Sequence, residues 1–399
     1  MRILMLSDVY FPRVNGVSTS IQMLRRALHV CGVETVLVAP RYNDEAEEPD
    51  LWRVPGVRVP RDPEDRLMGP RVLWARLKRI QPGEFDLIHI HTPFFAHLAG
   101  VRLAEKLGIP CVETYHTLFE EYFYHYLPFL PKSWLKSLAR VISKKECNRV
   151  SGVVAPSTPM LQALRAYGVE VPITVLPTGL ERADFSTCDG GAFRQRMGIA
   201  PERSVMLYVG RVAFEKNLDF LLDMMEPLRS QQPDVLLLIA GEGPARKALQ
   251  REVNRRGLQE QVRFIGYLDR RRELPDCYCA ANVFVFASRT ETQGLVLLEA
   301  MLLGIPVVAL AEMGTRDVLQ EGEGCRIAPD DPAGFAAAVA AVLDDPAAAQ
   351  VLGERGRAYA ARWTAEVMAG RMVQLYQSMM QPGHGHAATT VPGVETCGN

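Results

Sequence analysis

Short apolar runs rich in valine, isoleucine and leucine alternate along this chain with longer segments of helical periodicity. Six such runs precede residue 180, namely RILMLS, ETVLVA, DLIHIH, PCVETYH, GVVAPS and ITVLP. Six more follow it, namely SVMLYVG, DVLLLIAG, VRFIG, NVFVFAS, IPVVAL and GCRIAP. Continuous apolar runs are typical of strands that are buried on both faces of a parallel sheet. The pattern therefore predicts an α/β chain with two Rossmann-like, doubly wound domains that face one another across a cleft.

The turn-rich, polar segment at 176–191 marks the boundary between these domains. We expect a first domain at 1–178 and a second at 179–361, since 399 residues suffice for two domains. A C-terminal helix at 362–380 can then cross back to the first domain. The tail at 381–399 has no apolar period, and we expect it to be disordered.

Composition excludes several classes of protein. Hydrophobic residues make up 48% and charged residues 23% of the chain, as in ordinary soluble globular proteins. The formal net charge of -1 gives no electrostatic reason to expect a nucleic-acid partner. The eight cysteines are scattered without zinc-site spacing, which indicates free thiols in a cytosolic protein. No apolar run of about 18 residues is present, so we expect no membrane span.

The loop after the first strand is a candidate anion site. Asn15 and Gly16 stand at the mouth of a helix that ends near Gly32. Both residue types tolerate positive φ, which lets backbone N–H groups at a helix N-terminus close on a diphosphate. The alternative is an ordinary turn in which Ser18 or Thr19 caps the helix.

The loop after the first strand of the second domain, YVGRVAFEKNLDF, places Arg211 and Lys216 ahead of a helix. Two cations there can neutralise a departing diphosphate. Surface cations are usually only solvated, but a position at the carboxyl end of a strand favours a role in binding. The turn GEGP at 241–244 lacks the full G-x-G-x-x-G spacing and can be purely structural.

The segment SRTETQGLVLLEAMLLGIPVVA at 288–309 carries two carboxylates around an apolar helix. Glu299 lies within that helix, and a buried carboxylate without a partner is costly, so it must find one in the fold or in a ligand. Glu291 precedes the helix, and the N–H groups of Gly294 and Leu295 lie at its start. We favour recognition of sugar hydroxyls; the alternative is a Glu299 that pairs with a core arginine or a backbone amide. His116 follows another first-domain strand, and this position favours a role in the cleft over a structural one.

Taken together, GRVAFEKN, GEGP, VRFIGYL, SRTETQGLVLLEAMLLGIPVVA and the histidine of TYHT resemble the motifs of the retaining GT-B glycosyltransferases of family four, also called glycosyl transferases group 1. The resemblance covers roughly residues 1–380. It implies an N-terminal acceptor domain, a C-terminal nucleotide-sugar domain, and transfer of a sugar from a nucleotide diphosphate sugar with retention of anomeric configuration. No Asp-x-Asp motif is present, so the sequence requires no metal, and the donor is a substrate, with no cofactor implied.

The resemblance also implies roles for particular residues. Glu291 and Glu299, with seven residues between them, match the paired glutamates that contact the donor sugar hydroxyls and the nucleotide ribose. The implied catalytic residues are His116 and Glu291, and the implied donor-binding residues are Gly16, Arg211, Lys216, Gly294, Leu295 and Glu299. Asn15 stands where the family usually has a first glycine.

A basic segment in the first domain bears on the acceptor. From Lys132, KSWLKSLARVISKKECNR repeats a cation every fourth residue beside apolar side chains, as in a helix that lies on an anionic membrane surface. The predicted membrane-contact residues are Lys132, Trp134, Lys136, Arg140 and Lys144. The aromatic cluster EEYFYHYLPFLP leads into this helix, and the basic stretch at 71–82 can extend the patch. The alternative is a solvated helix face whose apolar side packs on the domain.

The segments TYHTLFEEYFYHYLP and TETQGLVLLEA look most like bacterial diacylglycerol glucosyltransferases and their sulfolipid- and phosphoinositol-modifying relatives. This resemblance implies a cytoplasmic enzyme, peripheral on the inner face of the cell membrane, that transfers a hexose from UDP-glucose to a lipid such as diacylglycerol. The alternative is a transferase that uses GDP-mannose or another nucleotide sugar and a phosphoinositol, polyprenyl-linked or polysaccharide acceptor. A sugar-nucleotide epimerase and a non-catalytic scaffold of the same fold are the less favoured hypotheses.

Overall fold

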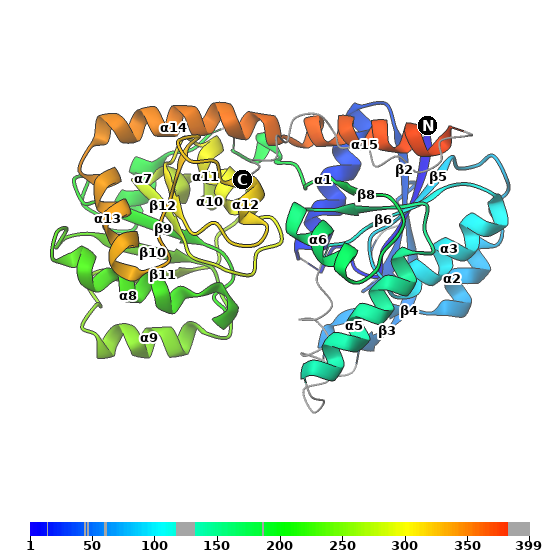
Figure 1. The fold of residues 1–399 in the computed structure, drawn as a ribbon, viewed down its shortest axis with the longest axis horizontal. Helices are drawn as coiled ribbons and strands as arrows, with labels where there is room; N and C mark the ends of the chain where they lie inside the picture. The colour runs from blue at the N-terminus through cyan, green and yellow to red at the C-terminus, as the bar shows by residue number, and fades with distance from the viewer. Residues whose placement is uncertain are drawn as a thin grey trace. The chain divides into compact units, whose positions relative to one another are not determined.

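The computed structural model describes residues 1–13, 15–43, 45, 48–59, 62–116, 132–185 and 187–381. The chain forms two compact units, one of Met1–Gly179 with Ala365–Asn399 and one of Leu180–Thr364 (Figure 1). The predicted boundary at residue 178 lies one residue before the end of the first of these segments. The predicted disordered tail, apart from Gln381, and the aromatic cluster at 120–131 lie outside the described residues.

The first unit contains an eight-stranded sheet in the order β4-β3-β2-β1-β5-β6-β7-β8. Its strands are β1 (Arg2–Leu6), β2 (Glu34–Arg41), β3 (Leu51–Val59), β4 (Asp62–Met68), β5 (Leu87–Ile90), β6 (Cys111–Thr114), β7 (Gly152–Ala155) and β8 (Ile173–Val175). All neighbours pair in parallel except β3 and β4, which pair antiparallel at one edge. The sequence predicted the other six strands but missed these two. β4 is the edge strand, and β3 pairs with β2 along residues 51–55 but with β4 along residues 56–59, so neither half of β3 is paired on both sides. The proline and glycine of LWRVPGVRV and the polar residues of DPEDRLM are tolerated in such positions.

The helices of the first unit are α1 (Gly16–Val30), α2 (Pro70–Leu77), α3 (Phe95–Leu107), α5 (Lys132–Cys147), α6 (Thr158–Ala166) and α15 (Ala365–Met380). Although α15 ends the described chain, it belongs to this unit and packs against α1 (Figure 1). The side chains of Met368, Met372 and Tyr376 are buried on the inner face of α15. Burial of this face ties the C-terminal segment to the sheet that begins the chain.

The second unit contains a parallel six-stranded sheet in the order β11-β10-β9-β12-β13-β14. Its strands are β9 (Val205–Val209), β10 (Leu236–Ala240), β11 (Val262–Gly266), β12 (Val283–Phe286), β13 (Val307–Ala309) and β14 (Cys325–Ile327). All six match the predicted apolar runs. Every residue of β9, β10, β12 and β13 is buried, which explains why these strands show no polar alternation.

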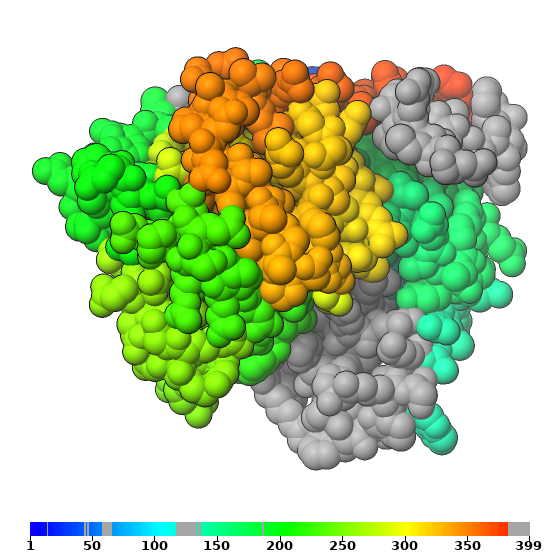
Figure 2. Space-filling model, turned by 60° about the vertical axis from the view of Figure 1, so that its left-hand side comes forward, coloured from blue at the N-terminus to red at the C-terminus, as the bar shows by residue number. Residues whose placement is uncertain are grey.

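Helices cover both faces of this second sheet. They are α7 (Gly190–Arg196), α8 (Leu218–Arg229), α9 (Arg246–Arg255), α10 (Glu273–Cys279), α11 (Leu295–Leu302), α12 (Thr315–Val318), α13 (Pro332–Leu343) and α14 (Pro346–Ala360), with short 3-10 turns η1 (Arg182–Phe185), η2 (Phe214–Lys216) and η3 (Ala361–Trp363). Figure 2 shows α13, in orange, against α8, in green, where these two helices pack together. The two sheets with their helices confirm the predicted pair of doubly wound α/β domains.

The expectation of free thiols is wrong for two cysteines, because Cys188 and Cys279 form a disulfide. Their separation of 91 residues hid the pairing from any argument based on spacing. The fold brings them together because α7 packs on α10. Gly190 has no room for a side chain there, since a Cβ atom would lie 2.1 Å from the carbonyl oxygen of Cys279. Among the cysteines that the structure describes, the free ones are Cys31, Cys111, Cys147, Cys277 and Cys325.

Among the described residues, no single helix combines the length and apolar character of a membrane span. Within the same described ranges, one pair, Pro332–Leu343 and Pro346–Trp363, passes that test jointly, with a bend of 97° between its members.

Candidate active site

The loop after β9 is fixed by hydrogen bonds from side chains to backbone carbonyl oxygens. Gly210 has a φ of 155°, and the hydroxyl of Tyr208 donates to the carbonyl oxygen of Arg211 over 3.2 Å. Arg211 is exposed and lies 3.7 Å from the carboxylate of Glu215. Asn217, in the left-handed region with a φ of 57°, ends the loop before α8 and donates through Nδ2 to the carbonyl oxygen of Ala287 over 3.1 Å. The predicted diphosphate-binding loop is therefore anchored to the end of β12.

Lys216 and Glu291 form an ion pair between the loops that follow β9 and β12. The Nζ atom of Lys216 lies 2.7 Å from Oε1 of Glu291, and 19% and 21% of the two side chains are exposed. The hydroxyl of Thr290 also donates to the carbonyl oxygen of Glu215 over 3.2 Å. The carboxyl ends of parallel strands meet at one edge of a sheet, so two residues 75 apart in sequence are brought into contact. This edge presents a cation beside a carboxylate, a combination that suits an anionic ligand with hydroxyl groups.

The predicted residues Gly294 and Leu295 lie at the start of α11. Gly294 has a φ of 86°, and Leu295 is the first helical residue. The first N–H groups of such a helix have no acceptor within the helix and can bind an anion or an oxygen atom. The loop before α11 is packed tightly, since a Cβ atom at Gly314 would lie 2.0 Å from the carbonyl oxygen of Thr292.

Glu299 finds its partners within the fold. It is 1% exposed; its Oε1 accepts a hydrogen bond from Nη2 of Arg270 over 2.7 Å, and its Oε2 accepts one from the hydroxyl of Tyr278 over 2.8 Å. The charge of Glu299 raises the pKa of Arg270, and burial raises the pKa of Tyr278. Arg270 also lies 3.4 Å from Asp184 and over the ring of Phe185. The sequence required a partner for Glu299 but did not identify these residues, and a contact with a ribose stays a prediction.

The GEGP turn is held by close backbone contacts. A Cβ atom at Gly241 would lie 1.9 Å from the carbonyl oxygen of Gly210, and one at Gly243 would lie 2.3 Å from that of Val212. The N–H of Val212 donates to the carbonyl oxygen of Glu242 over 2.9 Å. These contacts join the loops after β9 and β10, so the glycines have a structural role here.

The loop at Asn15 differs from the expected anion site. Asn15 is extended, with a φ of -155°, and Gly16 already has helical backbone as the first residue of α1. Neither residue adopts the positive φ on which the sequence argument rested. The helix is capped by Asn15, whose side chain accepts from the N–H of Ser18 over 2.8 Å, and not by Ser18 or Thr19. Asparagine satisfies the N-cap directly, which removes the need for a positive-φ turn.

His116 follows β6 and meets a second histidine that the sequence argument missed. Its Nε2 lies 3.2 Å from Nδ1 of His91, and the two rings stack with centroids 5.5 Å apart. Burial lowers the pKa of His116 to about 4 and that of His91 well below its ordinary value. Both imidazoles are therefore neutral at physiological pH. His89 and His91 stand two residues apart in DLIHIH, and residues two apart in a strand share a face. This spacing was a signal for a cluster of histidines at the end of that strand.

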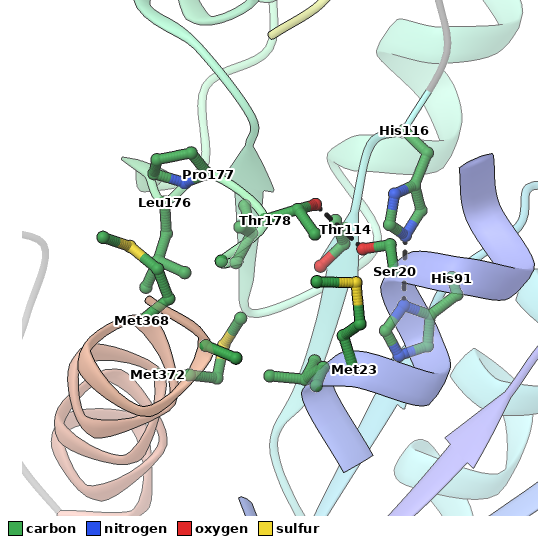
Figure 3. Close-up of a pocket in the computed structure, with 14 residues that line it drawn as sticks. Ser20, Met23, His91, Thr114, His116, Leu176, Pro177, Thr178, Met368 and Met372 are labelled. Carbon is green, nitrogen blue, oxygen red and sulfur yellow. Dashed lines mark hydrogen bonds between the residues drawn. The ribbon is translucent and has the colours of Figure 1, made fainter. Parts of the chain in front are cut away.

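These histidines line a pocket within the first unit (Figure 3). Figure 3 shows Met23 from α1 and Met368 and Met372 from α15 lining its apolar side. Ser20 and Thr178, hydrogen-bonded to each other over 2.9 Å, lie between the methionines and the histidines. The pocket thus combines an apolar wall with neutral hydrogen-bonding groups.

Asp8 is another buried group that sequence reasoning missed. It accepts hydrogen bonds from the hydroxyl of Thr92 over 2.8 Å and from the N–H of Ala96 over 3.1 Å, at the start of α3. Burial raises the pKa of Asp8 to about 6. The carboxylate therefore joins the ends of β1 and β5 to the N-terminus of α3.

The helix α5 exposes three of its larger apolar side chains. Trp134 is 73% exposed, and Leu138 and Val141 are also exposed, whereas Ala139 and Ser143 are fully buried. Ile142 is half-buried, and the side chain of Leu135 lies outside the described part of the structure. Membrane contact and the alternative of an apolar side packed on the domain therefore both stay predictions.

The predicted cations lie on the same helix. The side chains of Arg140 and Lys144 are exposed, with the guanidinium of Arg140 5.6 Å from the ring centre of Tyr167. The side chains of Lys132 and Lys136 lie outside the described part of the structure. Contact with a membrane stays a prediction. Over the described ranges, no group of three histidine, cysteine, aspartate or glutamate residues is placed to hold a metal ion.

Comparison with known proteins identifies the family. Residues 14–183 match Glycosyltransferase Family 4, and residues 191–359 match Glycosyl transferases group 1. The alpha-monoglucosyldiacylglycerol synthase of Streptococcus pneumoniae is 31% identical over 320 residues, covering 77% of this chain and 71% of that protein. Glycogen synthase of Mycobacterium tuberculosis is 31% identical over 400 residues, covering 92% and 91%. The sucrose-phosphate synthase structure from Thermosynechococcus elongatus superposes with a TM-score of 0.76 at 24% identity, covering 95% and 98%.

Two parallel-sheet α/β units with these matches define a nucleotide-sugar glycosyltransferase of the GT-B fold. The protein is thus a hexosyltransferase. It belongs to the family 4 glycosyltransferases, glycosyl transferases group 1.

Proposed function

We propose that this enzyme transfers a hexose, with UDP-glucose as the favoured donor, to a membrane lipid such as diacylglycerol, and that the anomeric configuration is retained. The observation that carries the proposal is the Lys216–Glu291 ion pair at the strand ends of the second unit. The relative from Streptococcus pneumoniae supports the choice of donor sugar and acceptor, because its name describes a glucosyl diacylglycerol.

Lys216 and Arg211 would bind the diphosphate of the donor. A fixed ammonium and a planar guanidinium at the same loop can neutralise the negative charge that develops as the diphosphate leaves. The first N–H groups of α11, at Gly294 and Leu295, would add dipolar donors. Oε2 of Glu291 has no hydrogen-bond donor among the described residues and would accept from hydroxyls of the donor sugar.

Glu299 would contact the nucleotide ribose only by accepting a further hydrogen bond beside those from Arg270 and Tyr278. Each carboxylate oxygen has two lone pairs, so Oε1 and Oε2 can each accept a second hydrogen bond. Because the side chain is almost fully buried, a ribose hydroxyl would reach it only after a shift of Arg270 or Tyr278. Arg270 and Tyr278 therefore belong to the proposed ribose site together with Glu299.

His116, as a neutral imidazole, would form a hydrogen bond with the transferred sugar. The acceptor hydroxyl would attack from the face that the diphosphate leaves, and the departing phosphate oxygen would take its proton. Positioning of the reactants and stabilisation of the leaving charge would then supply most of the rate enhancement. Gly16, at the start of α1, would bind the donor, and the space around it leaves room for a ligand, since nothing lies within 4 Å of a Cβ atom built on it.

The exposed face of α5 would dock on the anionic inner surface of the cell membrane. Trp134, Leu138 and Val141 would enter the headgroup region, while the basic residues attract anionic lipids. Docking of this kind would bring a lipid acceptor to the first unit. The predicted contact residues for this step are Lys132, Trp134, Lys136, Arg140 and Lys144.

The proposal is tested by a mass-spectrometric transfer assay. Purified protein receives UDP-glucose, UDP-galactose or GDP-mannose in turn, with anionic liposomes that contain diacylglycerol. We expect a hexosyl lipid from UDP-glucose, and a loss of about a hundredfold in Glu291→Gln, where a neutral amide replaces the carboxylate. Glu252→Gln is the matched control, because Glu252 is ion-paired with Arg255 and Arg256 on the surface of α9.

Two results would contradict the proposal. Full activity in Glu291→Gln would remove this residue from the site. Donor hydrolysis without a lipid product would exclude diacylglycerol as acceptor, and a polysaccharide would be tried next because of the identity with glycogen synthase.

Membrane docking has its own test in liposome flotation. The charge-reversed triple variant is Lys136→Glu, Arg140→Glu and Lys144→Glu, and its matched control is Lys247→Glu, Arg251→Glu and Arg255→Glu, with the same spacing on α9. We expect the first triple variant alone to stay in the unbound fraction at about 0.1 M salt. Unchanged flotation of the first variant would refute docking through α5.

A further inference from the structure

His91 meets His116 at the carboxyl edge of the first sheet. The only hydrogen bond that described residues make with the His116 ring runs from its Nε2 to Nδ1 of His91, over 3.2 Å. The rings lie 26° from parallel, and Figure 3 shows the two side chains turned toward one another on the pocket wall. His91 has no role in the motifs of the sequence or in the function proposed above.

The ring of His91 is packed against a third histidine, His89. The centroids of these two rings lie 4.0 Å apart. His89 is itself fixed on both sides, with Nδ1 2.6 Å from the hydroxyl of Tyr376 and Nε2 2.7 Å from the hydroxyl of Thr114. The backbone N–H of His91 donates to the carbonyl oxygen of Leu6 over 2.9 Å. Tyr376 and Thr114 thus hold the His89 ring, which in turn packs on the His91 ring, and Leu6 holds the His91 backbone.

The hydrogen bond between two neutral imidazoles restricts which ring nitrogen of His116 carries the proton. Burial lowers the pKa of both residues, so each ring carries one N–H and one bare nitrogen. Their hydrogen bond needs an N–H on one side and a bare nitrogen on the other. The state of His91 therefore decides which nitrogen of His116 is protonated.

The second nitrogen of His91 indicates which state is present. Its Nε2 is buried without a hydrogen-bond partner among the described residues. Buried donors without an acceptor are rarer than buried acceptors without a donor. The proton of His91 therefore belongs on Nδ1, where it has an acceptor, and His116 then carries its own proton on Nδ1.

We propose that His91 is a positioning residue, whose Nδ1–H donates to Nε2 of His116 and holds His116 in the tautomer that presents an Nδ1–H donor to an oxygen of the transferred sugar. The part of this inference that concerns the sugar rests on the function proposed above. His116 donates to the sugar directly, and His91 acts only through His116. Without His91, His116 can place its proton on Nε2, and the donor toward the sugar is lost.

The test compares three variants of the full chain. His91→Asn places an amide near the position of Nδ1 and can still donate, His91→Leu keeps similar volume without a donor, and His91→Gln keeps a polar group that reaches toward the position of Nε2. The first readout is the two-bond ¹H–¹⁵N NMR spectrum of His116, assigned with His116→Gln. The second is kcat and KM for UDP-glucose in the liposome assay.

We expect the Nδ1–H tautomer of His116 in the wild type and in His91→Asn. His91→Leu should show the Nε2–H tautomer and a kcat about tenfold lower, with KM for UDP-glucose changed less than twofold, because one hydrogen bond to the sugar is lost. His91→Asn should restore kcat to within about threefold of the wild type. If His91→Leu does not fold, the contrast between His91→Asn and His91→Gln provides the same comparison.

An Nε2–H tautomer of His116 in an active wild type would overturn this inference alone. So would unchanged kcat and tautomer in His91→Leu, or an equal loss of kcat in the folded asparagine and leucine variants. A wild type that shows the expected tautomer but transfers no sugar from any donor would instead overturn the proposed function and leave the histidine pairing in place.

Discussion

Removal of the Arg270 guanidinium would isolate a buried charge. Glu299 is 2% exposed in its side chain and has two partners, Arg270 at 2.7 Å and Tyr278 at 2.8 Å. Arg270→Met keeps the length of the aliphatic stem but removes the positive charge, so that the carboxylate is left with the tyrosine alone. Arg271→Met is the matched control, because Arg271 also pairs with an acid, Asp184 at 3.2 Å, and is 59% exposed.

The expected loss of stability follows from this geometry. Breaking a buried pair by removing one partner typically costs about 3–5 kcal/mol. Since 32% of the Arg270 side chain is exposed, solvent screens part of the interaction, and the Tyr278 bond remains; we therefore expect about 2–3 kcal/mol. The control should lose less than about 1 kcal/mol, as exposed pairs do. For a unit of this size each kcal/mol lowers the Tm by about 2–4 °C.

The assay is urea unfolding, followed by tryptophan fluorescence and circular dichroism, in a double-mutant cycle. Glu299→Gln in the Arg270→Met background removes the isolated charge, so the double variant should recover more than half of the lost free energy of unfolding. A loss below about 0.5 kcal/mol in Arg270→Met would refute the reasoning. The same conclusion would follow if Glu299→Gln gave no recovery, because the cost would then not come from an unpaired carboxylate.

Three further predictions concern stability. Gly241→Ala should lower the free energy of unfolding in urea by more than about 3 kcal/mol. The reason is that the φ of Gly241 is 138° and a new Cβ atom would lie 1.9 Å from the carbonyl oxygen of Gly210. A soluble variant of normal stability would contradict this. Cys188→Ser removes the disulfide to Cys279, which spans 91 residues, and should lower the free energy of unfolding by about 2–4 kcal/mol. Reduction of the wild type should lower it by a similar amount. Burial lowers the pKa of His89 to about 3, so the folded state excludes a proton that the unfolded chain binds below pH 6.5. His89→Gln should therefore reduce the fall in stability between pH 6 and pH 4 by about 1.4 kcal/mol per pH unit, and an unchanged pH slope would argue against a buried neutral His89.

The strands of the second unit could be predicted because burial on both faces leaves a strong signal in the sequence. Runs such as SVMLYVG and NVFVFAS have no polar alternation, and every residue of β9 and β12 is buried. The strands β3 and β4 lacked this signal, since they pair at the edge of the first sheet and include Pro55 and Asp62. Predictability thus followed the apolar character of the run, since the edge strands β8, β11 and β14 carry such runs and were predicted as well.

The site was predictable in its charged residues but not in their partners. Lys216, Glu291 and Glu299 stand in loops and helices that follow strands, and a position of this kind can be read from the sequence. The partners Arg270 and Tyr278 lie 29 and 21 residues from Glu299, on a different helix–loop segment. Which side chain reaches Glu299 depends on how α10 packs beside α11, and no local pattern encodes that packing.

The strand ends of the two units differ in charge, and this difference suits the two halves of the proposed reaction. In the second unit, Lys216 and Arg211 are partly exposed cations near the N-terminus of α11, and all of these features favour a diphosphate. In the first unit, His91 and His116 have lowered pKa values and carry no charge at physiological pH. Neutral imidazoles can hydrogen-bond hydroxyl groups without attracting a second anion.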